Sequence, residues 1–196
     1  EYASNPEFNT LFLSEARIAA QLDHPNIIKI IEAGEFHGEY FIAMEYAFGQ
    51  HIADMAQKGD QLRQYLPIEL ACFIVGQVAL GLSYAYGAVN EDGNPMRVVH
   101  RDLSPHNILI TYAGKVKILD FGIAQTEMTQ RESSVLQGKF SYMSPEQVLG
   151  RRLDHRSDIF SLGVSFYELI TRKRLFRRES QLLVLKEVSE AQIEPP

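Results

Sequence analysis

Three polar side chains in the middle of the chain have the types and spacing that chemistry on a phosphate group requires. Asp102 and Asn107 lie in the segment V-V-H-R-D-L-S-P-H-N-I-L-I, and Asp120 follows after short apolar runs. Carboxylate and amide oxygens are ligands for Mg²⁺, which leaves its other positions to water and phosphate oxygens. A carboxylate can also orient an attacking hydroxyl and accept its proton late in the reaction. The set indicates phosphoryl transfer from a nucleotide. The plainer alternative for Asp102 is a turn aspartate that caps backbone amides.

The apolar periodicity predicts short strands beside these residues and helices further away. The predicted strands are 27–33, 40–46, 107–111 and 115–119. The predicted helices are 9–22, 52–58, 67–86, 158–170 and 179–190. We expect Cys72 to be buried in its helix, 87–97 to be an exposed loop, and the polar stretch 125–137 to be mobile. This order is an α+β pattern in which a small sheet portion precedes a mainly helical body.

The composition restricts the class of protein. The chain has 196 residues and a formal net charge of −6, so it lacks the basic footprint of a nucleic-acid-binding protein. Its single cysteine excludes an internal disulfide and fits a reducing compartment. It contains no run of about 18 apolar residues and no signal peptide. We expect part of a cytoplasmic protein with no nucleic-acid partner and no membrane span in this segment. Since it starts without Met and ends at Pro195-Pro196, we interpret it as an internal piece of a longer protein that carries any membrane anchor elsewhere.

Four motifs resemble those of eukaryotic-type serine/threonine protein kinases, in particular their bacterial members. Residues 98–110 resemble the catalytic loop, and 119–122 (L-D-F-G) resemble the metal loop. Residues 138–147 (G-K-F-S-Y-M-S-P-E-Q) resemble the end of the activation segment, and 158–163 the start of the buried central helix. The resemblance runs from the family's helix C to about its helix G. It implies a truncated bilobal kinase fold, with a partial N-lobe at 1–46 and, at 47–196, a C-lobe that lacks its final helices.

The resemblance also assigns catalytic roles at matching positions. Asp102 would orient the acceptor hydroxyl, while Asn107 and Asp120 would hold Mg²⁺ beneath the phosphates of ATP. Glu15 would pair with an ATP-binding lysine on a preceding strand. Asp158 would hydrogen-bond the backbone of the catalytic loop; the compatible alternative is an N-cap at the start of its helix.

The nucleotide base would be bound at a hinge. Met44 resembles the gatekeeper, the Glu45 carbonyl and the Ala47 amide would meet adenine edges, and Leu109 would form the floor beneath the ring. The alternative is an ordinary apolar strand end at this position.

Regulation by phosphate is a further implication. Arg101, next to the catalytic aspartate, marks the subclass whose activation segment is ordered by a phosphate. Ser133 and Ser134 are the preferred acceptors, Thr126 and Thr129 are secondary ones, and a kinase–kinase dimer would carry out the autophosphorylation. The alternative is that these hydroxyls only solvate a loop.

The sequence departs from the family pattern at two neighbouring positions. Most serine/threonine kinases have lysine where this chain has Ser104, and threonine where it has Lys139. We hypothesise that the cation has moved, so that the Lys139 ammonium lies about 3–4 Å from Asp102 and stabilises the transferring phosphate. The alternative is a solvent-facing Lys139 and a tolerated loss at Ser104.

The glycine-rich loop and the ATP-binding lysine have no match in these residues, so we expect the fragment alone to be inactive. The resemblance implies an ATP- and Mg²⁺-dependent kinase that phosphorylates serine or threonine in protein substrates. The alternatives are a pseudokinase that signals by shape and a small-molecule phosphotransferase.

Overall fold

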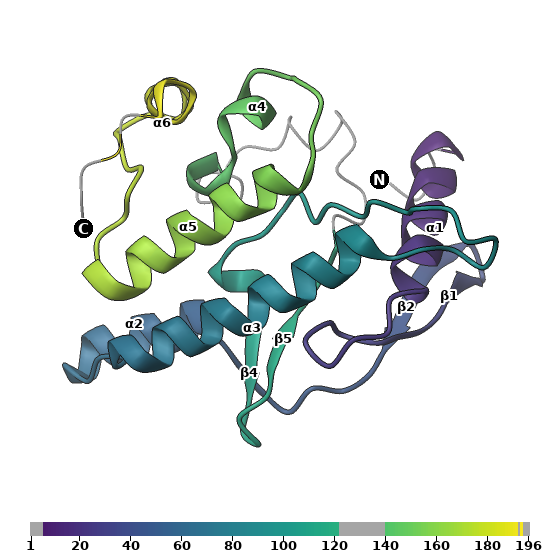
Figure 1. Ribbon diagram of the computed structural model, residues 1–196, viewed down its shortest axis with the longest axis horizontal. Coiled ribbons are helices and arrows are strands. Elements are labelled where there is room, and N and C mark those ends of the chain that lie inside the picture. Colours follow the sequence, from purple (N-terminus) through teal and green to yellow (C-terminus); the bar gives the residue numbers. More distant parts are fainter. Residues whose placement is uncertain (1–5, 122–139, 192, 194–196) are drawn as a thin grey trace.

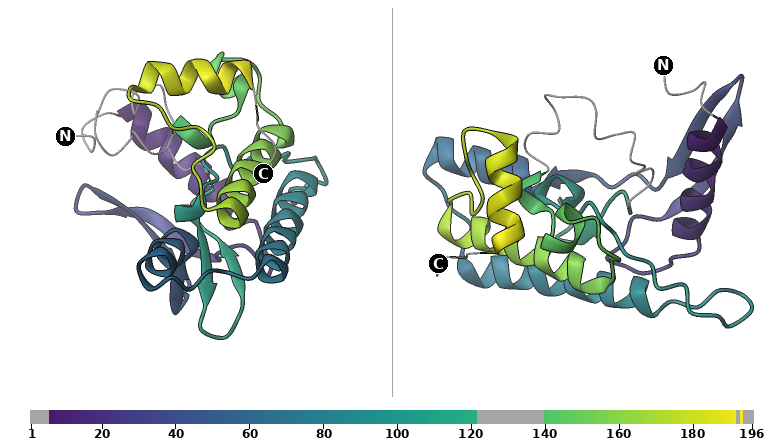
Figure 2. Two further views of the ribbon diagram at one scale, coloured as in Figure 1. Left: turned by 90° about the vertical axis from the view of Figure 1, so that its left-hand side faces the viewer. Right: turned by 90° about the horizontal axis from the view of Figure 1, so that it is seen from above.

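The structure is a computed structural model that describes the backbone of residues 6–121, 140–191 and 193 and the side chains from residue 13 onward. It has the predicted α+β architecture. A helix and a two-stranded sheet occupy one end, and a mainly helical body with a three-stranded sheet occupies the other (Figures 1 and 2).

The smaller end consists of helix α1 (Pro6–Ala20) and the antiparallel strands β1 (Ile30–Phe36) and β2 (Glu39–Met44). The hairpin turns at His37 and Gly38, whose φ angles are 53° and 82°. Glycine adopts this left-handed backbone without strain. Helix α1 lies along the hairpin and is joined to β1 by residues 21–29 (Figure 2).

The second sheet has the order β3-β4-β5, formed by Gly49–His51, Ile108–Thr111 and Val116–Ile118, with antiparallel neighbours. The segment after α1 joins its edge, because Ile118 N donates to Asn26 O and Ile28 N donates to Ile118 O, each at 2.8 Å. The two ends of the molecule are therefore connected by main-chain hydrogen bonds at β5.

The helical body contains α2 (Ile52–Leu62), α3 (Ile68–Gly87), α5 (His155–Thr171) and α6 (Gln181–Glu190), with the short helix α4 (Pro145–Val148) between them. Two short 3-10 helices, η2 (Pro105–Asn107) and η5 (Phe140–Tyr142), complete it. Helices α3 and α5 lie side by side (Figure 1). Helix α3 also packs against β5, and Gly81 permits this close approach because a Cβ at that position would lie 2.7 Å from Ile118 Cδ1.

Three details differ from the sequence predictions. Helix α2 continues through Gly59 to Leu62, and Gly59 instead allows the returning chain to approach, since a Cβ there would lie 2.5 Å from the Gln64 carbonyl oxygen. Cys72 is exposed, because it lies one residue off the buried stripe that begins at Ala71. Helix α5 starts at His155 with Asp154 as its N-cap, so the N-cap alternative for Asp158 is wrong.

Helix α3 is the one helix in the described ranges that has the length and apolar composition of a membrane span. This is weak evidence, because the core helix of a globular protein meets the same criteria. Its residues Ile74, Val78 and Leu82 are buried in the main hydrophobic core. The loop that follows it, 88–97, is largely exposed, as predicted.

Candidate active site

Asp102 and Asn107 lie in contact in the loop that precedes β4. The Asn107 Nδ2 donates to the Asp102 carbonyl oxygen at 2.7 Å and lies 3.3 Å from Asp102 Oδ2. The turn is closed by Asn107 N, which donates to Ser104 O at 2.9 Å, and Pro105 opens the 3-10 helix η2. Because its amide nitrogen is used within the loop, Asn107 keeps its Oδ1 as a possible metal ligand.

Asp120 is brought towards this loop by the β4–β5 hairpin. Leu119 N donates to Asn107 O at 2.9 Å. Asp120 is the next residue along the chain, so its backbone lies close to that of Asn107. Asp120 is exposed and has a φ of 48°, a left-handed backbone conformation that aspartate adopts more readily than most other residues except glycine. One carboxylate and one amide oxygen fit Mg²⁺, which takes its remaining ligands from phosphate and water.

In the part of the chain described, there is no group of three or more His, Cys, Asp or Glu side chains that could hold a metal ion.

The buried side chain of His100 connects Leu119 to Asp102. Its Nε2 lies 2.8 Å from Leu119 O, its Nδ1 accepts from Asp102 N at 3.2 Å, and its ring centroid lies 4.8 Å from that of Phe121. The two contacts fix the tautomer with the proton on Nε2, since a carbonyl accepts and an amide donates.

The backbone of Arg101 is held by two helices, α5 and α4. Asp158 of α5 accepts from His100 N at 2.7 Å and from Arg101 N at 2.9 Å, as the resemblance implied. Gln147 of α4 donates from Nε2 to Arg101 O at 2.7 Å. The φ of Arg101 is 66°, so these bonds stabilise a strained backbone next to Asp102. Burial raises the pKa of Asp158, against the opposing effect of His100 and of the two amides.

Glu15 of α1 lies near the guanidinium of Arg101. Its Oε1 is 3.5 Å from Arg101 Nη1, and 17% of the Glu15 side chain is exposed. The glutamate expected to pair with a lysine on a preceding strand thus faces the catalytic loop in this chain. Its position on α1 agrees with the sequence prediction, while its lysine partner remains a prediction.

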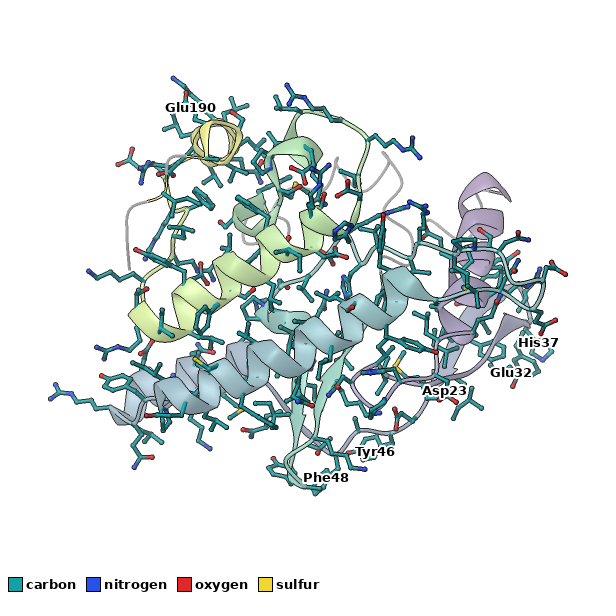
Figure 3. All side chains as sticks on the ribbon, viewed as in Figure 1. Asp23, Glu32, His37, Tyr46, Phe48 and Glu190 are labelled. Carbon is teal, nitrogen blue, oxygen red and sulfur yellow. The ribbon has the colours of Figure 1, made fainter. Side chains whose placement is uncertain are left out.

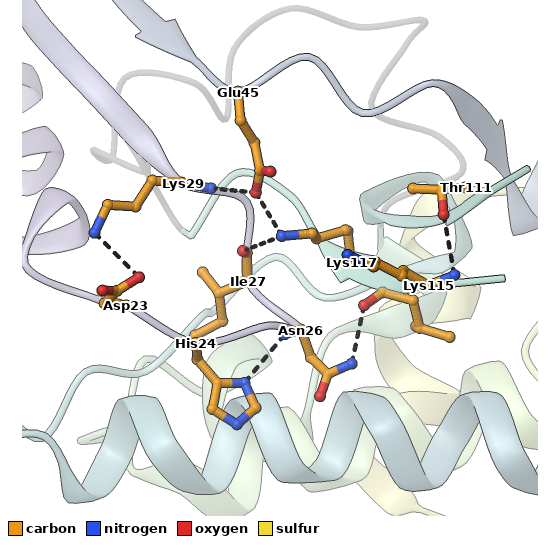
Figure 4. A network of polar contacts seen from close by, with 10 residues as sticks. Asp23, His24, Asn26, Ile27, Lys29, Glu45, Thr111, Lys115 and Lys117 are labelled. Carbon is orange, nitrogen blue, oxygen red and sulfur yellow. Dashed lines mark hydrogen bonds and ion pairs between the residues drawn. The ribbon is translucent and has the colours of Figure 1, made fainter. Parts of the chain in front are cut away.

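The hinge after β2 is anchored by a polar network (Figure 4). Lys117 Nζ lies 2.5 Å from Glu45 Oε1 and donates to Ile27 O at 3.2 Å, and the same Oε1 accepts from Lys29 N at 2.9 Å. Glu45 N also donates to Lys29 O at 2.8 Å. Burial opposes ionisation of Glu45, but the bonds from Lys117 and Lys29 outweigh it and lower its pKa.

Lys117 was not recognised from the sequence. It alternates with apolar neighbours in β5, yet its side chain is only 11% exposed because it points towards the hinge instead of solvent. The signal in the sequence was a single lysine between the apolar residues of a predicted strand. Asn26 was missed in the same way: its Nδ2 donates to Val116 O at 3.0 Å and to Gln77 Oε1 at 3.1 Å.

The other predicted adenine-site residues occupy the same region. Leu109 is buried in β4 opposite Lys117, and Met44 ends β2 with partial exposure. Ala47 lies in the connection to β3, beside a small cavity on the outer side of the hinge. The aromatic side chains of Tyr46 and Phe48 project from this outer side at the hinge (Figure 3).

The segment after residue 139 is fixed by its own hydrogen bonds. Ser144 and Gln147 form a capping box, with the Ser144 amide donating to Gln147 Oε1 at 2.9 Å. Glu146 Oε1 accepts the Ser157 hydroxyl at 2.6 Å. The Tyr142 hydroxyl donates to Glu168 Oε2 at 2.7 Å.

Several predicted residues lie outside the described ranges. These are Lys139 and the four proposed phosphate acceptors, Thr126, Thr129, Ser133 and Ser134. Ser104 is described and is buried, with 3% of its surface exposed.

Comparison with known proteins identifies the family. A family model described as "Protein kinase domain" matches residues 2–194, and the chain belongs to this family. Its fold is that of a truncated kinase domain: the crystal structure of the PknI kinase domain of Mycobacterium tuberculosis matches 91% of this chain and 62% of its own length, with a TM-score of 0.68 and 30% identity.

Two curated relatives are bacterial kinases with different stated specificities. The tyrosine-protein kinase MasK of Myxococcus xanthus is 44% identical over 98% of this chain. The serine/threonine-protein kinase PrkC of Bacillus subtilis is 36% identical over 94% of it. The chain spans 30% and 27% of the lengths of these two proteins.

Proposed function

We propose that the longer protein containing this chain transfers the terminal phosphoryl group of ATP to serine or threonine hydroxyls of protein substrates. The observation that carries the proposal is the contact between Asp102 and Asn107, with the backbone next to Asp120 hydrogen-bonded to Asn107. This arrangement supports one carboxylate for the acceptor and two oxygen ligands for a metal. PrkC, whose name states serine/threonine specificity, is similar over nearly the whole chain.

In this proposal each residue has a distinct role. Asp102 orients the acceptor hydroxyl and accepts its proton late in the transfer. The Asn107 Oδ1 and the Asp120 carboxylate would hold Mg²⁺, which supplies charge stabilisation to the phosphates when bound. Leu109 and the Met44–Ala47 hinge support the adenine. Lys139 and Ser104 act on the phosphate, and Arg101 with the acceptor hydroxyls in 126–134 gives regulation by phosphorylation in a kinase–kinase dimer.

Serine/threonine specificity is the finer part of the proposal, because MasK is named a tyrosine-protein kinase. The segment after Asp102 lacks the Ala-Ala-Arg or Arg-Ala-Ala insertion that the resemblance associates with tyrosine specificity. Phosphoamino-acid analysis of a generic protein substrate labelled by the full-length kinase tests this point. Phosphotyrosine as the main product would overturn it and leave the kinase assignment in place.

The second candidate function is a pseudokinase scaffold, which would signal by its shape. Thermal stabilisation of the full-length protein by ATP, with and without Mg²⁺, separates the two. Mg²⁺-dependent stabilisation together with phosphate transfer supports the enzyme. Neither effect in a folded full-length protein supports the scaffold.

A further inference from the structure

A cavity of about 610 Å³ lies beside the catalytic loop, between α2, α3 and α5. Pro105 and His106 of the catalytic loop contribute to its wall, so it lies next to the segment that begins at Asp102. Three consecutive cations at the end of α5, Arg172, Lys173 and Arg174, also line it. We name these three residues the cationic rim.

The cationic rim is unusual in a chain whose formal net charge is −6. All three of its side chains are exposed, and none makes an ion pair within the described part of the chain. Elsewhere several lysines and arginines are neutralised by a carboxylate at short distance, as Lys117 is by Glu45. A local excess of positive charge therefore stands at the mouth of the cavity.

Aromatic rings hold two of these cations in place without removing their charge. The guanidinium carbon of Arg172 lies 3.9 Å from the centroid of the Tyr65 ring, and that of Arg174 lies 5.9 Å from the centroid of Tyr142. A ring face attracts a guanidinium but leaves its N–H groups available at the edge. Arginines fixed in this way lose less side-chain entropy when they bind an anion.

Two carboxylates share the cavity, and their placement restricts where an anion would bind. Glu168 is recessed and accepts the Tyr142 hydroxyl; burial raises its pKa against the opposing effects of that hydrogen bond and of the Arg174 charge. Asp60 lies on α2, on the opposite wall. The outer edge at residues 172–174 is therefore the electropositive part, and an anion would bind there instead of at the floor.

We propose that the cationic rim binds an acidic side chain of the protein substrate while the acceptor hydroxyl lies at Asp102. The partner is an acidic peptide segment and not a free anion, because the cavity is continuous with the catalytic loop and is wide enough for side chains. The inference rests on the proposed kinase function and adds a preference for acidic substrates to it.

The test uses the full-length kinase and a serine peptide in which glutamate is placed in turn at each position on both sides of the serine. The matched peptides carry glutamine or lysine at the same place. We expect at least one glutamate position to raise kcat/KM over its glutamine match by about two- to fivefold for each exposed ion pair formed. The preference is expected to shrink with added salt.

Variants locate the effect. The Lys173 side chain makes no ring contact or ion pair among the described residues. Lys173→Gln is expected to lower the ratio of kcat/KM for the glutamate peptide to kcat/KM for its glutamine match. Lys173→Glu is expected to favour the lysine peptide. The matched control is Lys115→Gln, an exposed lysine on the β4–β5 hairpin away from the cavity, which is expected to keep the wild-type preference.

Equal rates for glutamate and glutamine peptides at every position would overturn the inference while leaving the kinase function intact. A preference that survives Lys173→Gln and the triple change to glutamine at 172–174 would also overturn it. Binding to phosphatidylserine vesicles that depends on the rim, without any peptide preference, would assign the rim to a membrane surface instead. No phosphorylation of any peptide or protein would contradict the proposed function itself.

Discussion

The side-chain amide of Gln147 bridges two segments that the sequence separates widely: its Nε2 donates to Arg101 O at 2.7 Å, and its Oε1 accepts from Ser144 N at 2.9 Å. One end of this amide closes the cap of α4, and the other holds the residue next to Asp102. Arg101 has a left-handed backbone, so its carbonyl needs such a partner to stay in place. The end of the activation segment is thereby joined to the catalytic loop.

Gln147→Glu separates the two functions of this amide. The variant keeps an oxygen for the Ser144 amide but replaces the donor to Arg101 O with a second acceptor, which repels it. We expect kcat of the full-length kinase to fall with a small change in thermal stability. Ser144→Ala is the control, because it removes the capping hydroxyl and leaves the Arg101 contact; it is expected to lower stability more than kcat. A wild-type kcat for Gln147→Glu would contradict a positioning role.

Asp158→Asn is expected to disturb the same loop from the other side. An amide group places at least one N–H against the His100 or Arg101 amide, so one buried donor loses its acceptor, at a cost of about 1–3 kcal/mol. We expect a lower unfolding free energy in chemical denaturation and a loss of kinase activity. Asp154→Asn makes the same chemical change at the N-cap of the same helix. Among the described residues the Asp154 side chain hydrogen-bonds only to Arg156, so activity should be kept.

The pair Glu45–Lys117 predicts a specific dependence of stability on pH. The folded-state pKa of Glu45 is lowered from its ordinary value of 4.5. A carboxyl group with a lowered pKa contributes stability that is present above the unfolded-state value and is lost as the pH falls through the folded-state value. We expect the difference in Tm between wild type and Glu45→Gln to be constant near neutral pH and to shrink below about pH 4.5.

Since the Glu45 side chain is 35% exposed, the neutral-pH difference should be modest, about 1 kcal/mol or less. Glu39→Gln, an exposed glutamate at the start of β2, is the control and should track wild type at every pH. A difference for Glu45→Gln that grows as the pH falls would contradict the sign of this linkage.

The order of the longer helices and of β1, β2, β4 and β5 was predictable from the sequence, and so was the proximity of Asp102 to Asn107. Strand β3 and the short helix α4 were not predicted. Apolar periodicity located all five longer helices, because each buries a stripe such as that of Ala71, Ile74 and Val78. The start of α5 was placed too late, since the polar first turn carries no apolar signal and Asp154, not Asp158, is its cap.

Contacts between distant segments were not predictable from local pattern. The burial of Lys117 depends on the approach of the hinge and of the 23–29 segment, which periodicity does not describe. The contact of Glu15 with Arg101 likewise requires the packing of α1 beside the catalytic loop. Exposure of Cys72 was missed because its neighbours on α3 are nearly all apolar, so the sequence does not show which face is covered.

Asp102 and Asp120 should separate turnover from metal binding. Asp102→Asn is expected to reduce kcat on the order of 10²–10⁴-fold while Mg²⁺-dependent stabilisation by ATP is kept. Asp120→Asn is expected to weaken that stabilisation as well, because a carboxylate ligand is lost. Thermal-shift titrations with Mg²⁺ and ATP, alongside kcat, provide the measurement. Equal losses of Mg²⁺-ATP stabilisation in both variants would contradict the division of roles.

The final prediction concerns the exchange of polar groups between Ser104 and Lys139. Ser104 is buried in the turn that holds Asn107, two residues after Asp102. If Lys139 supplies the cation that the family takes from position 104, Lys139→Thr abolishes turnover, and adding Ser104→Lys restores part of it. The double variant has one ammonium and one hydroxyl at these two positions, as the wild type has. The cation that would stabilise the transition state is therefore present again. The comparison is made in kcat of the full-length kinase, with Lys115→Thr as a control for loss of a surface lysine. A double variant no more active than Lys139→Thr alone would show that the two positions do not exchange roles.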